Sequence, residues 1–430
     1  MQRFYVETLG CPKNDVDSDK IVGTLTAQGL IAADDPEAAD LIVVNTCAFI
    51  EEARRESIDT VLALGERRKD GARLVVTGCM AERYGNELAE ALPEADQVAG
   101  FGVPIALGRK PVGVTSAPVP SIDLLNLPRP KSAAPWAYVK IAEGCDRNCG
   151  FCAIPSFRGP QRSRDMESIL REVDDLEVRE VVLVAQDLAS YGKDRPDELG
   201  AGAIVDLVEA VAARVPRTRL LYLYPSDLSD RLIEAILATS VPYFDLSLQH
   251  VSKAHLRRMR RWGDGERFLE RIARIRELSA DAAFRSNFIV GYPGETEEDH
   301  DQLLRFVEEA QLDWCGFFTF SPEEDTHAMT LGDHVDPRLM EERIAELREL
   351  QDAITARRRD DLIGTTIEVL VDESGIGRSH REAPSIDGVV HLPTTLEMGT
   401  FHHVEVVDAL GPDLVAQGAV VDARESVHAG

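Results

Sequence analysis

The chain has 430 residues and a net charge of −28 at pH 7, from 47 Lys and Arg against 75 Asp and Glu. A length of this order suggests two or three domains. A chain this acidic is a poor default ligand for bare nucleic acid or an anionic membrane, because phosphate binding draws on clusters of Lys and Arg. The N-terminal residues show no cationic segment followed by an apolar run, and no apolar run approaches the ~18 residues of a membrane span. We therefore expect a cytoplasmic protein with no membrane partner.

Strand and helix patterns alternate over the first hundred residues, which predicts a Rossmann-like parallel sheet flanked by helices. Three short β-branched runs, RFYVETLGC, DLIVVNTC and ARLVVTGC, end on Cys11, Cys47 and Cys79. Ligands of open α/β sheets bind outside the carboxyl ends of the strands, so the three thiols are expected to converge on one site. The plainer alternative is that each cysteine is a small, buried apolar residue. The predicted helices are Asp17–Gln28, Ile50–Lys69 and Ala81–Ala91.

Residues 108–135 are rich in Pro, Ser and Ala and lack a sustained period, which predicts a linker between an N-terminal domain (1–107) and a central domain (136–361). The central domain resumes the alternation with six strand patterns. Six strand–helix units predict an open, partial TIM-type barrel rather than the full eight. The predicted strands are Ala137–Ala142, Val178–Gln186, Arg219–Tyr224, Phe244–Gln249, Phe284–Gly291 and Cys315–Phe320, and a helix at Pro337–Asp361 closes the series.

Short strand patterns divided by Gly and Pro fill residues 362–430 and predict a small antiparallel β-barrel of OB-like size. From Gly364 onward there are eleven carboxylates against three arginines, and Phe401 is the single aromatic residue. A barrel that grips RNA carries a basic face with stacking aromatic residues. We therefore expect this acidic barrel to dock a basic protein, unless the charges only solvate its surface.

A second cysteine array, EGCDRNCGFCAIP, follows the first predicted barrel strand and holds Cys145, Cys149 and Cys152 with C-x₃-C-x₂-C spacing. Zinc would need a fourth ligand, and no nearby Cys or His offers one. A [4Fe–4S] cluster on three thiolates keeps one iron open to a small molecule. The same holds for Cys11, Cys47 and Cys79, which are again a set of three. An electron-carrying module predicts sets of four instead. The seventh cysteine, Cys315, lies in an apolar strand and is expected to be structural.

The array at the end of the first barrel strand, with Phe151 before its last cysteine, resembles the radical S-adenosylmethionine (SAM) superfamily. LGCPKNDVDSD, NTCAFI, TGCM, EGCDRNCGFCAIPSFRGPQRSRDMESI, AQDLASYG and GYPGET resemble the methylthiotransferases of that superfamily in order and spacing. LIGTTIEVLVDE and GRSHREAPSIDG resemble their TRAM domain. CPKN, AIPSFRGPQRSR, AQDLASYG and SLQH are similar to the branch that modifies an aspartate of small-subunit ribosomal protein twelve, uS12. Asp19 and the bulky Trp262 depart from the family pattern without touching an expected ligand.

The resemblance implies a transferase with two [4Fe–4S] clusters and SAM. A cluster on Cys145, Cys149 and Cys152 would bind SAM and yield a 5′-deoxyadenosyl radical that abstracts a hydrogen from the β-carbon of the target aspartate. An auxiliary cluster on Cys11, Cys47 and Cys79 would deliver sulfur, and a second SAM the methyl group. The implied partners are uS12, free or in the small subunit, an electron donor and a sulfur donor, with no tRNA. The alternative is the same chemistry on a tRNA adenosine.

Other predicted site residues rest on weaker patterns. Positions at the carboxyl ends of barrel strands line such sites, which favours Gln186, Asp187, Gln249 and His250, although loop scaffolding explains each equally well. The basic run Arg257, Arg258, Arg260 and Arg261 is the feature that favours nucleic acid, whereas a solvated helix face is the plainer interpretation. The predicted SAM-contacting residues are Phe151, Gln186, Gly291, Gly294 and Glu295, and a plain strand-to-helix turn also explains the GYPGE segment.

Overall fold

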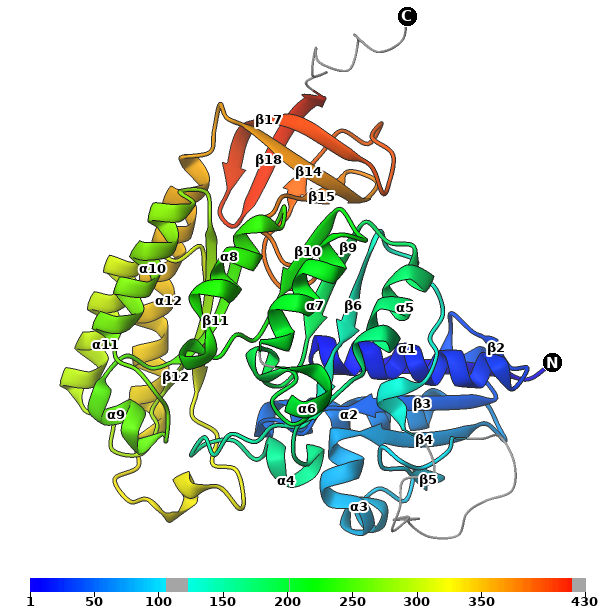
Figure 1. Cartoon of the computed structure of the whole chain (residues 1–430). Coiled ribbons are helices and arrows are strands. Elements are labelled where there is room, and N and C mark those ends of the chain that lie inside the picture. The colour runs from blue at the N-terminus through cyan, green and yellow to red at the C-terminus, as the bar shows by residue number, and fades with distance from the viewer. Residues whose placement is uncertain (106–122, 201, 420–430) are drawn as a thin grey trace, which may run out of the picture.

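The structure is a computed structural model that describes residues 1–105, 123–200 and 202–419. Three sheet-based units follow one another along the chain (Figure 1): a parallel sheet covered by helices, an open parallel barrel and a small closed barrel. The fold is therefore α/β, as the sequence predicts. Most of the predicted linker, residues 108–122, lies outside the described residues. Within those residues, no helix has the length and apolar character that crossing a membrane requires.

The N-terminal unit is a five-stranded parallel sheet with helices on both faces. It consists of β1 (Arg3–Thr8), β2 (Ile31–Ala32), β3 (Leu41–Thr46), β4 (Arg73–Gly78) and β5 (Gln97–Val98), with helices α1 (Pro12–Ala27), α2 (Glu51–Arg67) and α3 (Cys79–Ala91). The strand order is β2-β1-β3-β4-β5. Alternate side chains of the fully buried β3 enter two separate apolar clusters, one on the α1 face and one on the α2 and α3 face. The three predicted strands and three predicted helices are present, whereas β2 and β5 are too short to leave a pattern.

The central unit is an open barrel of six parallel strands, which confirms the predicted number. Its strands are β6 (Trp136–Lys140), β9 (Glu180–Val184), β10 (Arg217–Leu220), β11 (Tyr243–Gln249), β12 (Ala283–Val290) and β13 (Trp314–Thr319). Two three-stranded sheets, β10-β9-β6 and β11-β12-β13, are joined by a parallel bridge between Leu223 and Leu246. The main outer helices are α5 (Met166–Leu176), α7 (Ala203–Ala212), α8 (Asp230–Ala238), α10 (Gly265–Leu278), α11 (Glu297–Ala310) and α12 (Pro337–Asp360).

All six barrel strands differ from their predicted bounds by at least one residue, and the differences in the second and third strands bear on the site. The third strand is β10, which ends at Leu220, whereas the sequence pattern extends to Tyr224. Tyr222 has a φ of +65°, so the backbone leaves the extended conformation there. The second strand, β9, ends at Val184 rather than at Gln186. Gln186 and Asp187 therefore lie in a loop at the carboxyl end of the barrel.

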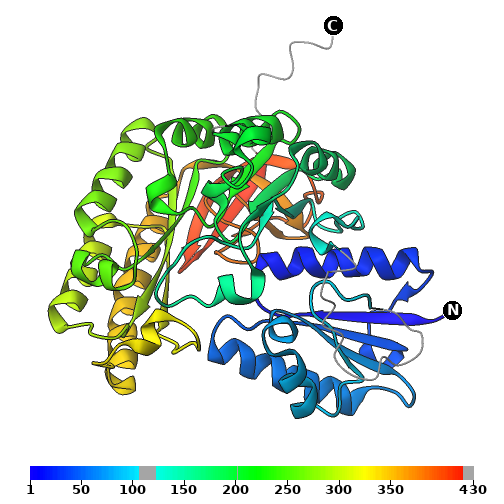
Figure 2. The ribbon, with the colours of Figure 1, turned by 60° about the horizontal axis from the view of Figure 1, so that its bottom comes forward.

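Helix α1 lies between the N-terminal sheet and the open side of the barrel (Figures 1 and 2). Val16 of α1 is fully buried and shares an apolar cluster with Tyr138 of β6 and Trp314 of β13, the two edge strands. Lys13, one turn earlier, places its ammonium 3.3 Å above the ring of Tyr222. The first unit therefore covers the gap that a six-stranded barrel leaves open.

The C-terminal unit is a closed barrel, as predicted, with strands in the order β14-β15-β16-β18-β17. The strands are β14 (Thr366–Glu373), β15 (Ile376–Arg378), β16 (Val390–His391), β17 (Phe401–Leu410) and β18 (Asp413–Ala419). Phe401 is not a free stacking surface, since the guanidinium groups of Arg179 and Arg217 lie 5.2 and 5.0 Å from its ring. The single aromatic residue of this unit is thus occupied by the central barrel.

Buried ion pairs connect the small barrel to the amino ends of the central strands. Glu180 of β9 accepts from Arg219 of β10 at 2.8 Å and from Arg378 of β15 at 3.0 Å. Asp387, in the connection between β15 and β16, accepts from Tyr243 at 2.6 Å and from Arg285 at 2.8 Å. Several of the acids counted from the sequence therefore neutralise arginines inside the molecule, namely Glu368, Asp372, Glu382 and Asp387. The expectation that the acidity of this unit is free to dock a basic protein is weakened accordingly.

The buried carboxylates predict a loss of stability in acid. Burial opposes ionisation of Glu180 and Glu382, but Arg378 beside the first and Arg359 beside the second outweigh it and lower each pKa to about 2. The ordinary value is 4.5, so the stabilisation is complete above that pH and is lost as the pH falls from 4.5 towards 2. The effect is on the order of 3 kcal/mol per group. We expect the midpoint temperature of thermal unfolding of the apoprotein, measured by circular dichroism, to fall between pH 5 and 3. In Glu180→Gln the midpoint is expected to fall less steeply with pH. Equal slopes of midpoint against pH in the two proteins would contradict this account.

Candidate active site

The first cysteine triad lies at the carboxyl edge of the N-terminal sheet, where three adjacent strands end. Cys11 is the N-cap of α1, Cys47 follows β3, and Cys79 begins α3 directly after β4. The ladders keep β1, β3 and β4 in step up to these ends. Burial, together with the charges of Cys11 and Cys79, raises the pKa of Cys47 to about 12. The structure thus brings the three predicted thiols of this unit together.

The chain around Cys47 is packed so closely that position 10, which lies against Cys47, accepts only glycine. Gly10 has a φ of +102°, and a Cβ there would lie 2.8 Å from the Cβ and 3.0 Å from the Sγ of Cys47. No real Cβ makes such contacts, and the conformation itself favours glycine. Gly10 therefore lets the segment that carries Cys11 approach Cys47.

The second triad lies in the loop between β7 (Ala142–Glu143) and α4 (Ile154–Arg158), at the carboxyl end of the first barrel strand. Burial is the main cause that raises the pKa of Cys145 to about 11 and that of Cys152 to about 12, and the charge of Cys149 contributes to both. The three thiols therefore lie near enough to oppose one another's ionisation. This is the edge of the barrel where enzymes of related architecture place their chemistry.

Helix α4 carries the second triad into the N-terminal unit. Ala153 and Phe157 belong to the apolar cluster that also contains Cys79 and Met80 of α3. The short helix lies between the barrel and the N-terminal sheet (Figure 1). The cysteine loop of one unit is therefore anchored in the core of the other, although the triads are far apart in the sequence.

Arg158, the last residue of α4, links the first triad to the strand that leads to the second. Its Nη2 lies 2.9 Å from the Sγ of Cys79, and its Nη1 lies 3.0 Å from Glu143, two residues before Cys145. The guanidinium also pairs with Asp17 of α1 at 3.1 Å, and its side chain is 3% exposed. It lies 4.2 Å from the ring of Phe101. One buried cation thus contacts a thiol of the first triad and the strand that leads to the second.

Glu143 is the other centre of this polar network. It accepts from Lys140 at 2.9 Å and from Gln186 at 2.5 Å, in addition to Arg158. Burial would raise the pKa of Glu143, but the charges of Arg158 and Lys140 outweigh it and lower the pKa to about 2. Lys140 also pairs with Asp17. Glu143 is therefore a fixed anion that holds α4, β6 and the loop after β9 in one arrangement.

The spacing of the thiols argues against a single metal ion in either triad. Among the described residues, the set of His, Cys, Asp and Glu ligand atoms that lie within 4.8 Å of one another is His250, His255 and Glu295, and neither cysteine triad forms such a set. One tetrahedral zinc with Zn–S bonds of about 2.3 Å would hold its sulfurs about 3.8 Å apart. Neither triad brings its three sulfurs this close together, and the all-thiol composition of each triad suits an iron–sulfur cluster.

Two arginines, Arg147 and Arg261, lie beside the second triad. The sequence motifs do not identify either of them as a partner of the thiols. The Nη1 of Arg261 lies 3.2 Å from the Sγ of Cys149. The guanidinium of Arg147 pairs with Asp187 at 2.6 Å and with Asp227, and both arginines stack on the ring of Tyr224. Asp187, which was predicted to line the site, therefore fixes Arg147. A cationic side chain beside a thiolate group favours binding of a negatively charged cluster or ligand.

The predicted SAM-contacting residues occupy two places. Phe151 packs against the main core and Gln186 donates to Glu143, both beside the second triad. Gly291 and Gly294 lie in the turn after β12 with φ values of +84° and +83°. Glu295 is 8% exposed and accepts from the backbone of Gly291 and from Arg343, both at 2.7 Å. Its carboxylate stabilises the turn, and contact of these residues with SAM stays a prediction.

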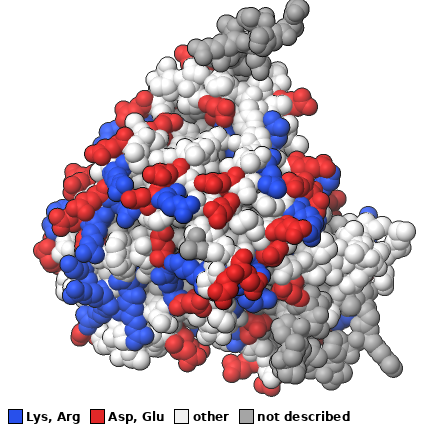
Figure 3. Space-filling view, in the orientation of Figure 1, with Lys and Arg blue, Asp and Glu red and all other residues white. Residues whose placement is uncertain are grey.

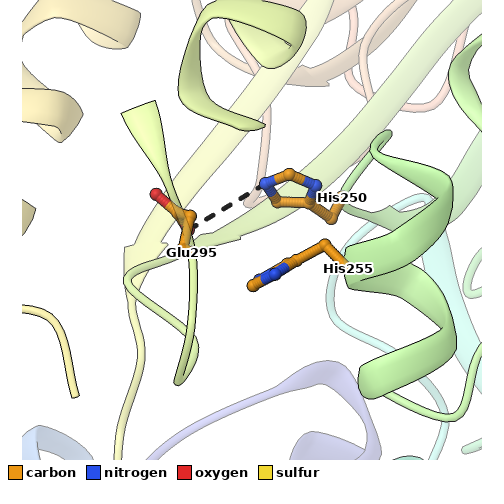
Figure 4. Close-up of side chains that lie close together, drawn as sticks. All are labelled: His250, His255 and Glu295. Carbon is orange, nitrogen blue, oxygen red and sulfur yellow. Dashed lines mark ion pairs between the residues drawn. The ribbon is translucent and has the colours of Figure 1, made fainter. Parts of the chain in front are cut away.

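A cluster of His250, His255 and Glu295 lies behind this turn (Figure 4). Burial lowers the pKa of His250 well below its usual range and that of His255 to about 4, so both rings are neutral. His250 lies 3.9 Å from Glu295, whose charge is offset by Arg343. A cation here would face that guanidinium, so we interpret the cluster as packing that joins α9 (Lys253–Arg258) to the turn after β12. Cys315, as predicted, lies apart from both triads and packs against the main core.

Comparison with known proteins gives a match for each of the three units. Residues 3–100 match Uncharacterized protein family UPF0004, residues 139–307 the Radical SAM superfamily and residues 363–418 the TRAM domain. The chain is 40% identical to "Ribosomal protein uS12 methylthiotransferase RimO" of Kineococcus radiotolerans, over 96% of each chain. The protein of the same name from Moorella thermoacetica is 42% identical over 91% of this chain and 93% of its own. The chain belongs to the RimO family. The predicted radical SAM methylthiotransferase membership and its ribosomal-protein branch are thereby confirmed.

A further relative of the same name and one solved structure also match this chain. That of Aquifex aeolicus is 40% identical over 96% of this chain and 97% of its own. Among solved structures, the radical S-adenosylmethionine methyltransferase TsrM from Kitasatospora setae aligns with a TM-score of 0.56 at 12% identity, over 82% of this chain and 89% of that chain. At this identity the likeness concerns the fold alone. The fold of this RimO family member is thus one that also occurs in a radical SAM enzyme with a different name.

Proposed function

We propose that this chain transfers a methylthio group to the β-carbon of an aspartate in ribosomal protein uS12. The observation that carries the proposal is the near full-length identity to proteins named for this activity, 40% over 96% of both chains. The two convergent cysteine triads support it, because the chemistry needs one site that makes a radical and one that supplies sulfur. We also propose the boundaries 1–107, 136–361 and 362–430 for the three domains, with 108–135 as a linker, and a cytoplasmic location.

The residues that would hold the two [4Fe–4S] clusters are the two triads. Cys145, Cys149 and Cys152 would hold the one that binds SAM, and Cys11, Cys47 and Cys79 the auxiliary one. When bound, the first group supplies the electron for cleaving SAM to a carbon radical, and the second offers an open iron for sulfur. Each site offers three thiolates, and a [4Fe–4S] cluster on three thiolates keeps one iron open, which suits this use.

The chain's own residues then orient and shield the reacting groups. Arg261 donates to Cys149 and Arg158 to Cys79, so each triad has one guanidinium against a thiol. Such hydrogen bonds offset part of the negative charge of a thiolate set. The polar network through Glu143 connects the elements that carry the two triads and holds them in one arrangement. Phe151 and Gln186 flank the second triad and would contact SAM.

The same chemistry on tRNA is the alternative, and two observations disfavour it. The relatives reported above are all named for uS12. The small barrel presents five exposed acids among its described residues, Glu368, Glu373, Glu397, Glu405 and Asp408, and its one aromatic ring is covered by Arg179 and Arg217. An RNA-binding barrel needs the opposite charge and free rings. The proposal also requires an electron donor and a sulfur donor, which we place outside this chain.

The proposal is tested by anaerobic reconstitution with iron and sulfide, followed by incubation with SAM, a reductant, unmodified small ribosomal subunits and bulk tRNA. We expect intact-mass analysis to show one methylthio increment on uS12 and nucleoside analysis to show none on tRNA. An increment on tRNA adenosine alone would overturn the substrate and retain the chemistry. Formation of 5′-deoxyadenosine with neither product would overturn both substrates.

A further inference from the structure

A cluster of exposed cations lies on α9, the turn that follows it and the first turn of α10, on a chain whose net charge is −28. We call it the basic rim, and Figure 3 shows it as the blue group at the lower left, where Figure 1 places α9. Trp262 is 39% exposed beside it, and the guanidinium of Arg267 lies 5.6 Å from the indole ring. The rim consists of Lys253, Arg257, Arg258, Arg260 and Arg267.

Internal ion pairs leave much of this charge uncompensated. Lys253 and Arg267 share Asp264 at 3.8 and 3.7 Å, and Arg258 lies 3.7 Å from Asp333. Among the described residues, no ion pair involves Arg257 or Arg260. Elsewhere on the molecule, exposed arginines such as Arg171 and Arg305 have a carboxylate within about 3.2 Å. The rim is therefore a local cationic surface rather than part of the mixed-charge surface.

The basic rim is built onto the second cysteine triad. The backbone N–H of Gly150 donates to the carbonyl of Met259 at 2.8 Å, and the hydroxyl of Tyr292 donates to that of Arg258 at 3.1 Å. Arg261, which continues the same turn, reaches Cys149 at 3.2 Å. When a side chain of a macromolecule enters this site, the surface around that side chain therefore lies over the basic rim.

The chemistry of the rim fits a phosphate chain. Exposed arginines with an exposed indole are the groups that bind RNA phosphates and stack on bases. A free, basic ribosomal protein gains nothing from five cations, because like charges repel. We propose that the basic rim contacts phosphates of ribosomal RNA, so that the target aspartate is taken from an assembled small subunit. This inference rests on the proposed function.

The test compares Arg257→Glu/Arg260→Glu with a matched control, Arg171→Glu/Arg305→Glu, which makes the same charge change on other helices. Initial rates of uS12 modification are measured against assembled subunits and against free uS12 at several KCl concentrations. With subunits, we expect the rim variant to lower kcat/KM about 10-fold or more through KM, and to reduce the slope of log(kcat/KM) against log[KCl] by roughly 2. The control variant and all reactions with free uS12 are expected to keep wild-type salt dependence.

Binding to protein-free small-subunit RNA, measured by filter retention, separates the remaining possibilities. The proposal requires wild type to bind this RNA more tightly than the rim variant. If the rim variant lowers kcat/KM with subunits but leaves RNA binding unchanged, the proposal is overturned, and the rim contacts an acidic protein surface instead. Equal losses on subunits and free uS12 would also overturn it, since the variant would then disturb the triad itself. If wild type modifies neither substrate, the proposed function fails, and the RNA measurement still decides whether the rim binds phosphates.

Discussion

Replacing Cys145 with alanine is expected to abolish both 5′-deoxyadenosine formation and methylthiolation, whereas replacing Cys79 with alanine is expected to abolish only the second. The two thiols belong to separate triads on separate units, each with its own arginine. Loss of one ligand from a set of three removes the group that the set would hold. The expected fall in product is at least about 10³-fold for each variant.

Cys315 provides the matched control for this pair. It is also a partly buried cysteine of the same chain, but it packs against the main core and belongs to neither triad. Cys315→Ala is expected to retain wild-type iron content and product. Each triad variant is expected to hold about half of the wild-type iron by colorimetric assay, because one of two clusters remains. If Cys79→Ala stopped 5′-deoxyadenosine formation as completely as Cys145→Ala, the division of labour between the triads would be wrong.

The order of the elements could be predicted because each leaves a local pattern. The runs that became β1, β3 and β4 are short, β-branched and followed at once by helical periodicity, and each ends on a cysteine. Parallel strands place their carboxyl ends at one edge, so three cysteines in three local patterns were enough to predict one cluster of thiols. The same reasoning located the second array after the first barrel strand.

Contacts between units could not be predicted in the same way. Arg158 lies 79 positions from Cys79 in the sequence, and no periodicity connects them. The pairing depends on α4 entering the core of the N-terminal unit, which is a tertiary event. Arg261 reached Cys149 through a turn with a left-handed residue, Arg260, at a φ of +55°. Nothing in the sequence of the basic run separates Arg261, which faces inward, from Arg257, Arg258 and Arg260, which are exposed.

The charge pattern within one barrel strand indicates where some of the C-terminal acids point. The strand that became β10 reads RTRL, and two arginines at alternate positions of a buried strand need partners on the same face. Those partners are Glu180 on the neighbouring strand and the carbonyl groups and acids of the small barrel. A reading of charge within the strands would have indicated that some acids of residues 362–430 are turned inward. The net charge of a segment does not say which of its charges face solvent.

The second large effect is expected at Arg158, the residue that contacts both sides of the site. Arg158→Met removes a buried cation and leaves Glu143 and Asp17 with Lys140 as their remaining buried partner. Uncompensated buried charge typically costs 3–5 kcal/mol, so we expect urea unfolding of the apoprotein to begin at clearly lower concentration. Arg158→Lys keeps the positive charge but lacks the planar guanidinium that binds several acceptors at once. It is therefore expected to be more stable to urea than Arg158→Met and less stable than wild type.

The same variant is expected to change the auxiliary cluster that Cys79 is proposed to hold. An N–H donor at 2.9 Å from a ligand sulfur stabilises added electron density, so its loss makes reduction harder. Redox titration followed by electron paramagnetic resonance is therefore expected to give a more negative midpoint potential for the auxiliary cluster in Arg158→Met, with the potential of the other cluster unchanged. Arg219→Met is the matched control, because Arg219 is equally buried and paired but contacts neither triad. Arg219→Met should weaken stability and leave both potentials at wild-type values, whereas equal shifts in the two variants would mean that Arg158 acts only through the general stability of the fold.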